Sequence, residues 1–421
     1  MSRLVILVVA FFALFTFTTA AKYHIAHKHS SNVQKISPDL VLSHLYLNEH
    51  KLVAYVVDWD IPKSIRWDHL DHIAYAFAEP NENGELESYS GSNLKYIVTE
   101  AHKNNVGVSI SVGGWSGSRY FSSLVSSPDK LHILVNNIMS MVKEYNLDGV
   151  NIDWEYPNDP NGVSCNLRNP KDTANYLTFV QELRKALDDK YKDIKKVITL
   201  AVGTSPFNDE NQNPTSNFDK GWSDTVDYFY IMSYDVSGSW MNQTGPNAPL
   251  KEASSGNYDT SVVQSVQAWS SAGIPNEQLI VGLPFYGTAL KTSQTVTSAS
   301  GLYVKLANPS TIKGDQYDEM GADPCPGAQK SYSGSFQWRS IISTGLLSNK
   351  NGWKAYWDKV STTPYAYHEK SNKFLSFDNP QSLKDKIDYI KKSNLGGAMI
   401  WSLEMDDAKN TLLASIQKVR D

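Results

Sequence analysis

Short apolar runs and amphipathic stretches alternate along the chain from about residue 51 onward. Eight of the runs are short and rich in Val, Ile, Leu and aromatic residues, as strands are, and most intervals between them repeat apolar residues at helical spacing. Strands that alternate with helices form a parallel sheet, and eight of them predict an α/β fold, the (β/α)8 TIM barrel. The expected strands are 52–57, 72–78, 107–112, 149–155, 197–203, 226–233, 278–285 and 396–402.

The interval between the seventh and eighth expected strands is much too long for one connecting helix. We expect an inserted α+β subdomain at about 288–372, between strand 7 and helix 7, followed by a helix near 381–393. Residues 51–421 would then form one barrel domain that carries this insertion. Further helices are expected at 92–104, 128–145 and 407–419.

The first fifty residues differ from the rest of the chain. Residues 1–21 have a positively charged start, an apolar run and a small-residue cleavage region, which is typical of a secretory signal peptide. An uncleaved anchor is the alternative, although the apolar run is shorter than the ~20 residues of a membrane span. The polar segment 22–50 holds five of the ten histidines at spacings that match no defined metal site, so we interpret it as a linker or pro-segment. We therefore predict a secreted, extracellular protein, with the cell wall as one setting and no membrane contact after signal cleavage.

Charge and cysteine content narrow the classes of partner. A net charge of −5 leaves no basic face for nucleic acid. We also expect the protein to be a monomer. The two cysteines, Cys165 and Cys325, are far apart and have no metal-ligand spacing. Two buried free thiols and one disulfide both remain open, and the disulfide suits a secreted protein. It would tie the loop after the fourth strand to the insertion.

The fourth expected strand carries polar residues on one face. Apolar residues at 150, 152 and 154 alternate with Asn151, Asp153 and Glu155. Side chains two apart on a strand point the same way, about 7 Å from one another. Two buried like charges are costly unless a site uses them. Active sites of barrels lie at the carboxyl ends of the strands. The polar residues at this strand end therefore indicate an active site.

Motifs at five strand ends carry a resemblance to a known family. They are Ser111-Val112-Gly113-Gly114, Asp148 to Glu155, Met232-Ser233-Tyr234-Asp235, Gly282 to Gly287 and Gly396 to Trp401. With these residues the chain resembles the family 18 glycoside hydrolases, the chitinase family, and in particular its secreted fungal members. The resemblance covers roughly residues 51–419.

The resemblance implies a chitinase that hydrolyses β-1,4-N-acetylglucosamine linkages by a retaining, substrate-assisted mechanism. It implies Glu155 as the general acid, with Asp153 and Tyr234 positioning the N-acetyl group of the substrate. It implies chitin or chitin oligosaccharides as the partner, and neither a metal nor an organic cofactor. The substrate-binding residues that it implies are Asn151, Asp235, Met232, Trp401, Tyr55, Phe77, Trp115 and Gly114.

One position departs from the family pattern. Asn151 stands where the family usually has Asp, and an amide cannot hold a negative charge. Without like-charge repulsion from this position, we expect Asp153 to hold a proton less readily.

Two other functions remain open. One is a non-catalytic chitin-binding lectin or toxin subunit on the same scaffold, which Asn151 favours and the presence of Glu155 opposes. The other is an endo-β-N-acetylglucosaminidase, which would need a cleft for branched mannose. The sequence Asn242-Gln243-Thr244 is a glycosylation sequon, and we expect it to carry a glycan.

Overall fold

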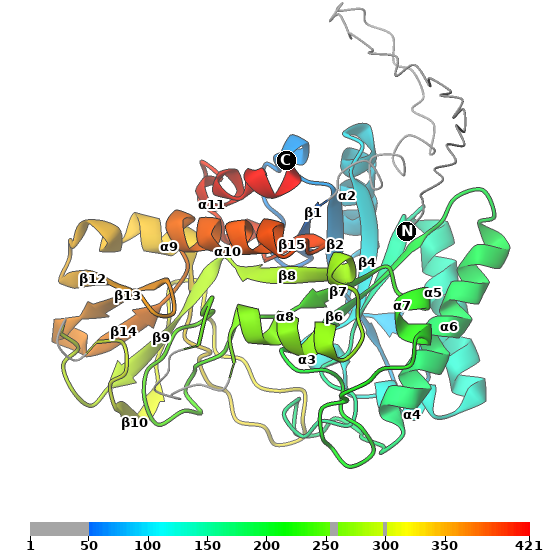
Figure 1. The fold of residues 1–421 in the computed structure, drawn as a ribbon, viewed down its shortest axis with the longest axis horizontal. Helices are drawn as coiled ribbons and strands as arrows, with labels where there is room; N and C mark the ends of the chain where they lie inside the picture. The colour runs from blue at the N-terminus through cyan, green and yellow to red at the C-terminus, as the bar shows by residue number, and fades with distance from the viewer. Residues whose placement is uncertain (1–49, 253–259, 298–300) are drawn as a thin grey trace, which may run out of the picture. The chain divides into compact units, whose positions relative to one another are not determined.

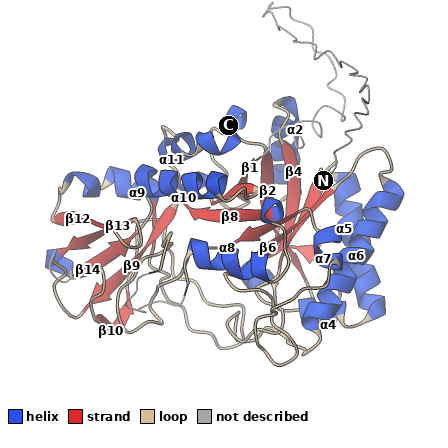
Figure 2. Cartoon of the chain, viewed as in Figure 1, coloured by secondary structure: helices blue, strands red, loops and turns tan. Residues whose placement is uncertain are grey.

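A closed barrel of eight parallel strands forms the centre of the fold (Figures 1 and 2). The computed structural model describes residues 50–252, 260–297 and 301–421, so the predicted signal peptide and nearly all of the segment 22–50 lie outside the described residues. β1 pairs with both β2 and β15, which closes the ring and confirms the TIM barrel. The barrel strands are β1 (Lys51–Val57), β2 (His72–Pro80), β4 (Gly107–Gly113), β5 (Gly149–Asp153), β6 (Val197–Val202), β7 (Tyr228–Ile231), β8 (Leu279–Pro284) and β15 (Gly397–Trp401).

Helices follow most of the strands and cover the outside of the barrel (Figure 1). Among the described residues, no helix is long and apolar enough to cross a membrane. The α-helices are α2 (Gly91–Lys103), α3 (Gly114–Gly117), α4 (Phe121–Val125), α5 (Pro128–Glu144), α6 (Asp172–Lys190), α7 (Gly221–Thr225), α8 (Val262–Ser271), α9 (Trp338–Ser343), α10 (Pro380–Lys392) and α11 (Thr411–Ser415). The short strand β3 (Leu86–Glu87) extends β2 in antiparallel pairing.

Alternate residues of the barrel strands enter two different cores, because successive side chains of a strand point to opposite faces. In β1, Leu52, Ala54 and Val56 pack with the surrounding helices, whereas Val53 and Tyr55 lie in a smaller apolar cluster inside the barrel.

The same alternation in β5 decides where its polar residues lie. Val150, Ile152 and Trp154 belong to the outer core, and the indole of Trp154 packs on Phe121. Asn151 and Asp153 therefore face the barrel interior, as predicted. The strand ends at Asp153, two residues earlier than expected, so Glu155 lies just beyond it.

A separate antiparallel sheet follows β8, which confirms the expected insertion (Figure 2). It has the order β10-β9-β14-β13-β12, and β11 pairs with β9 at its side. The chain then returns to the barrel through α10. The strands of this sheet are β9 (Tyr286–Thr292), β10 (Leu306–Thr311), β11 (Ser335–Gln337), β12 (Trp353–Asp358), β13 (Thr363–His368) and β14 (Lys373–Ser376).

The two cysteines form a disulfide. Cys165 and Cys325 are bonded, with their Cα atoms 5.6 Å apart, so the interpretation as two free thiols is wrong. The bond joins the loop after β5 to the insertion, across 160 residues of sequence.

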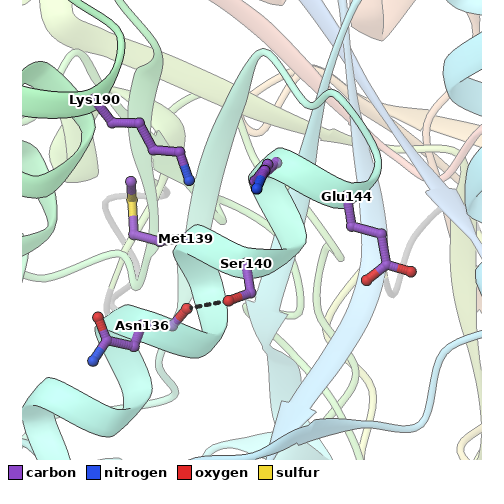
Figure 3. A pocket seen from close by; sticks show the side chains of 6 residues that line it. Asn136, Met139, Ser140, Glu144 and Lys190 are labelled. Atoms are coloured by element: carbon purple, nitrogen blue, oxygen red, sulfur yellow. Dashed lines mark hydrogen bonds between the residues drawn. The ribbon is translucent and has the colours of Figure 1, made fainter.

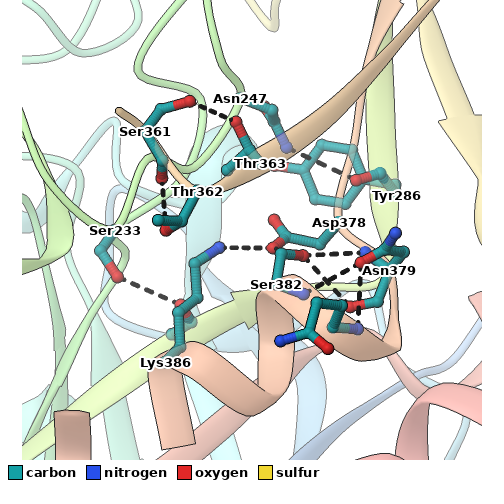
Figure 4. Close-up of polar contacts among 12 residues, drawn as sticks. Ser233, Asn247, Tyr286, Ser361, Thr362, Thr363, Asp378, Asn379, Ser382 and Lys386 are labelled. Atoms are coloured by element: carbon teal, nitrogen blue, oxygen red, sulfur yellow. Dashed lines mark hydrogen bonds and ion pairs between the residues drawn. The ribbon is translucent and has the colours of Figure 1, made fainter. Parts of the chain in front are cut away.

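A buried ion pair lies where the insertion returns to the barrel (Figure 4). Lys386 of α10 contacts Asp378 at 2.6 Å, and neither side chain is exposed. The hydroxyl of Ser382 also donates to the Asp378 carboxylate, at 2.6 Å. Burial lowers the pKa of Lys386, because desolvation disfavours the ammonium form, and the Asp378 charge opposes this shift. The helix α10 begins just after Asp378 with a capping box between Asn379 and Ser382.

At the amino end of β2, the buried His72 makes stability depend on pH. Its Nε2 lies 2.7 Å from Ser109 Oγ, and burial lowers its pKa from 6.5 to about 4 against the opposing charges of Asp148 and Asp71. The imidazole is therefore neutral when folded but takes up a proton below pH 6.5 when unfolded. We expect this residue to cost about 2 kcal/mol of stability between pH 7 and pH 5, and up to about 3 kcal/mol near pH 4.

Urea unfolding at pH 7 and pH 5 measures this effect in the native protein and in His72→Asn. The variant should lose less stability over that interval than the native protein. An equal loss in both would show that His72 does not cause it.

Candidate active site

Three hydrogen bonds fix the orientation of the Asn151 side chain inside the barrel. Its Oδ1 accepts from the hydroxyls of Tyr55 (2.8 Å) and Ser111 (2.7 Å), and its Nδ2 donates to Thr199 Oγ1 (2.9 Å). The Tyr55 hydroxyl also reaches Asp153 Oδ2 at 3.3 Å. The strand register explains these contacts, since β5 places Asn151 between Ser111 of β4 and Thr199 of β6.

Asp153 is the next inward-facing residue of β5 and is buried. Burial raises its pKa from 3.8 to about 7, although the hydrogen bond from Tyr55 opposes the shift. Its Oδ1 has no hydrogen-bond partner among the described residues. Asp153 can therefore carry a proton near neutral pH and can accept or donate a hydrogen bond through this oxygen.

Glu155 lies beyond the strand end, with a half-buried side chain. Burial and the negative charge of Asp153 raise the pKa of Glu155 well above its usual range, and a hydrogen bond with Tyr156 opposes the shift. Its backbone is held on both sides: the amide N–H donates to Ser118 Oγ, and Asn166 Nδ2 donates to the carbonyl, each at 2.8 Å. The backbone of Glu155 is thus fixed at this position, and the raised pKa of its side chain favours the protonated form that a general acid requires.

Tyr234 and Asp235 follow β7 and lie close to the two carboxyl groups. Burial, together with the charges of Asp153, Asp235 and Glu155, raises the pKa of Tyr234 well above its usual range, so its hydroxyl remains a donor. Asp235 has a positive φ of 54° and accepts a hydrogen bond from Tyr286. Burial raises the pKa of Asp235, and the hydrogen bond from Tyr286 opposes the shift.

Aromatic rings surround the carboxyl groups. The ring of Trp401, at the end of β15, lies 5.1 Å from Tyr55 and 5.7 Å from Phe77, and is nearly parallel to Phe77. Trp59 packs on the far side of Phe77, at 6.3 Å, and is 67% exposed. Met232 packs against the same inner cluster. These rings form an apolar surface of the kind on which a sugar ring can stack.

Gly114 and Trp115 follow β4 at the same end of the barrel. Gly114 has φ +82°, and a Cβ there would lie 2.8 Å from the Phe77 ring, so only glycine fits. Trp115 is 42% exposed, and its indole N–H donates to Asp323 of the insertion at 2.9 Å.

All eleven residues predicted from the sequence thus lie at or inside the carboxyl end of the barrel. The residues that contact them without having been predicted as members of the site include Tyr156, Tyr286, Thr199, Asn166 and Ser118. Tyr156 follows Glu155 in the sequence, and Tyr286 lies just after β8. Their positions at strand ends could therefore have predicted that they belong to the site. Nothing in the sequence marks Thr199 or Asn166.

The described residues form no cluster of metal ligands at this end of the barrel, and the cavity in Figure 3 is lined by other residues. Within the described ranges, no group of three or more His, Cys, Asp or Glu side chains could hold a metal ion. A cavity of about 620 Å³ opens beside α5 and α6 (Figure 3), and none of the residues that line it is a predicted site residue. It is lined by Asn136, Met139, Ser140, Lys143, Glu144 and Lys190.

Comparison with known proteins identifies the family of this site. Residues 51–406 match the model of the glycosyl hydrolases family 18. The chain belongs to this family. A chitinase from Rhizomucor miehei has a similar structure, with a TM-score of 0.86 and 53% identity over 88% of this chain and all of that one.

Two curated relatives carry different names. A chitinase-like effector from Moniliophthora roreri is 34% identical over 371 residues, 84% of this chain and 89% of its own length. Chitinase A1 from Niallia circulans is 30% identical over 320 residues, 72% of this chain and 41% of its own length. The family 18 relatives thus include proteins named as chitinases and proteins named as chitinase-like effectors.

Asn151 gives a direct test of the electrostatics of this family 18 site. In Asn151→Asp, a second carboxylate would share the hydroxyl of Tyr55 with Asp153, and their repulsion should raise the pKa of Asp153 above 7. Carboxyl titration by ¹³C NMR in a Glu155→Gln background measures this shift without interference from Glu155.

Asn151→Ala is the matched control, since it removes the amide and adds no charge. The pKa of Asp153 should rise more in the Asp variant than in this control. An equal or lower pKa in Asn151→Asp would contradict the expectation.

Proposed function

We propose that the protein is a secreted chitinase that hydrolyses β-1,4-N-acetylglucosamine linkages with retention. One observation carries this proposal: Glu155, whose pKa is raised by burial and by Asp153, stands at the strand end beside a wall of aromatic rings. Membership of family 18 supports the same substrate class.

In this mechanism Glu155 donates its proton to the glycosidic oxygen as the bond to the leaving sugar breaks. Its raised pKa favours the acid form, and activity should be lost as the pH rises through that pKa. Both carboxyl groups come from one strand end, which places them on the same side of the scissile bond. Membership of family 18 implies that the nucleophile is the carbonyl oxygen of the substrate's own N-acetyl group.

Asp153 and Tyr234 position this N-acetyl group. The unpaired Oδ1 of Asp153 accepts from the amide N–H and stabilises the positive charge of the cyclic intermediate. The Tyr234 hydroxyl donates to the N-acetyl carbonyl. Asn151 supports Asp153 through their shared partner Tyr55, and Asp235 binds a sugar hydroxyl.

The remaining predicted residues bind the sugar rings. Membership of family 18 implies Trp401 as the floor beneath the reacting sugar, and its ring contacts both Tyr55 and Phe77. Met232 lines the same surface. Gly114 leaves room for Phe77, and Trp115 offers a platform on the leaving side.

Product analysis on soluble chitin oligosaccharides tests the proposal. The native protein should release shorter oligosaccharides whose new reducing ends first appear as the β-anomer, as ¹H NMR would show. Binding of the oligosaccharides without any product between pH 4 and pH 8 would overturn it.

A chitin-binding protein without catalysis is the second candidate. Two observations favour it: a relative of almost full length is named as a chitinase-like effector, and Asn151 replaces the usual Asp. The product analysis separates the two candidates, because this one predicts binding alone.

Secretion and glycosylation complete the proposal. The disulfide Cys165–Cys325 suits an oxidising, extracellular setting, where the apolar start of the chain would direct it. The side chain of Asn242 is exposed, whereas Thr244 of the same sequon is buried and donates to Leu302 O at 2.5 Å. Asn242 is therefore accessible to a glycan, and deglycosylation should lower the mass of the secreted protein.

A further inference from the structure

In the insertion, the carboxylate of Asp318 holds together the two ends of a long loop. Asp318 Oδ2 accepts from the backbone N–H groups of Gly314 (2.7 Å) and Gly334 (3.0 Å), and its Oδ1 accepts from the Ser333 hydroxyl (2.9 Å). We name residues 319–332, between these anchors, the strap. A bridge between Gly321 and Ser331 holds its two arms together.

The tip of the strap is fastened to the barrel at three points. Asp323 accepts from the indole N–H of Trp115 at 2.9 Å, and the carbonyl of Pro324 accepts from Arg119 at 3.3 Å. Cys325 is bonded to Cys165. Trp115 and Arg119 follow β4, and Cys165 follows β5, so the tip contacts the side of the barrel that carries the two carboxyl groups.

The order of the strands shows what lies between the ends of the strap. Its base lies on β9, where Ala289 N donates to Gly334 O, and β9 follows β8 directly. In the closed ring, three strands separate β8 from β4 in either direction. A loop that starts beside β8 and is bonded beyond β4 therefore joins opposite sides of the ring at its carboxyl end.

The attachment lies next to the proposed acid. Asn166, which follows Cys165, donates to the carbonyl of Glu155. Gly162, on the other side of Cys165, is so close to that carbonyl that a Cβ would lie 2.3 Å from it. The loop to which the strap is bonded thus contacts the backbone of Glu155 directly.

Few packing contacts hold the strap in place. Most of its residues are exposed, including Met320 at 48%. The disulfide and the two hydrogen bonds of the tip therefore carry most of its attachment to the barrel.

We propose that the strap closes the cleft over a bound polysaccharide and makes the site selective for linear, unsubstituted chains. The proposal rests on the proposed function. A chain that carries bulky substituents cannot pass beneath a covalently fastened loop, whereas a short oligosaccharide can enter from one end. Opening the disulfide frees the tip and removes this restriction.

The test compares the native protein with Cys165→Ser/Cys325→Ser on two substrates. One is a chromogenic di-N-acetylchitobioside, and the other is glycol chitin, a soluble chitin with bulky hydroxyethyl groups. The ratio of kcat/KM on glycol chitin to that on the short substrate should rise several-fold in the variant. An unchanged ratio, or an equal loss on both substrates, would overturn the proposal, because the disulfide would then act only through Glu155.

A binding measurement separates this proposal from the proposed function. In a Glu155→Gln background, a fluorescent hexamer of N-acetylglucosamine should dissociate about tenfold faster when the disulfide is absent. Equal dissociation rates would overturn the proposed role of the strap even if the native protein is an active chitinase. If the native protein turns over no substrate, the proposed function fails, and these rates still decide the strap. Should the double Ser variant not fold, reduction and alkylation of the folded native protein open the same bond.

Discussion

Glu155→Gln is expected to lower kcat on chitin oligosaccharides by about 10³-fold, with little change in KM. The amide keeps the shape of the side chain but has no proton to donate to the leaving oxygen. Its neighbours Ser118 and Asn166 hold only the backbone of residue 155, so the fold around it should survive. Steady-state kinetics with reducing-end detection measures the effect.

Glu404→Gln is the matched control. Glu404 is also buried, and burial raises its pKa to about 7. It accepts from the Ser402 hydroxyl at 2.6 Å, a hydrogen bond that an amide oxygen can keep. This variant should retain nearly all activity. If both substitutions lowered kcat alike, loss of a buried carboxyl group rather than loss of the acid would explain the effect.

Lys386→Met is expected to lower the free energy of unfolding by about 3–5 kcal/mol. The substitution leaves Asp378 buried without its cation, and within the part of the chain that the structure describes, Ser382 is the side chain that still donates to it. Urea-induced unfolding followed by tryptophan fluorescence measures the loss.

The double variant Lys386→Met/Asp378→Asn tests the cause. Its neutral amide still accepts from Ser382, so most of the lost stability should return. A double variant that is less stable than Lys386→Met would show that the pair contributes by packing rather than by charge compensation.

The barrel could be predicted because parallel strands in such a fold are buried on both faces. Their sequences are short and almost wholly apolar, as in β1 and β6, and helical periodicity separates them. The inward direction of Asn151 and Asp153 followed from the period of two along β5. The predicted site residues came together because the carboxyl ends of parallel strands meet at one end of a barrel.

Other features depend on contacts between distant segments. Glu155 was placed inside the strand because the alternation continues to it, yet pairing of β5 with β4 and β6 ends at Asp153. Lys386 sits in a helix among other charged residues, where a sequence pattern indicates a solvated face, and only the return of the chain from the insertion buries it with Asp378. Whether Cys165 and Cys325 are bonded could not be decided from the sequence either, because the path of the insertion brings the two residues together.

The position of β15 in the ring has a consequence for the growing polypeptide. β15 pairs with β1 on one side and β8 on the other, and it is the last strand of the chain. Until residue 401 has left the ribosome, the backbone groups of β1 and β8 on these edges have no strand to bind, and such open edges favour association with other chains. The barrel therefore cannot close during synthesis of most of the chain, and its folding depends on protection of the β1 edge until the carboxyl-terminal strand arrives.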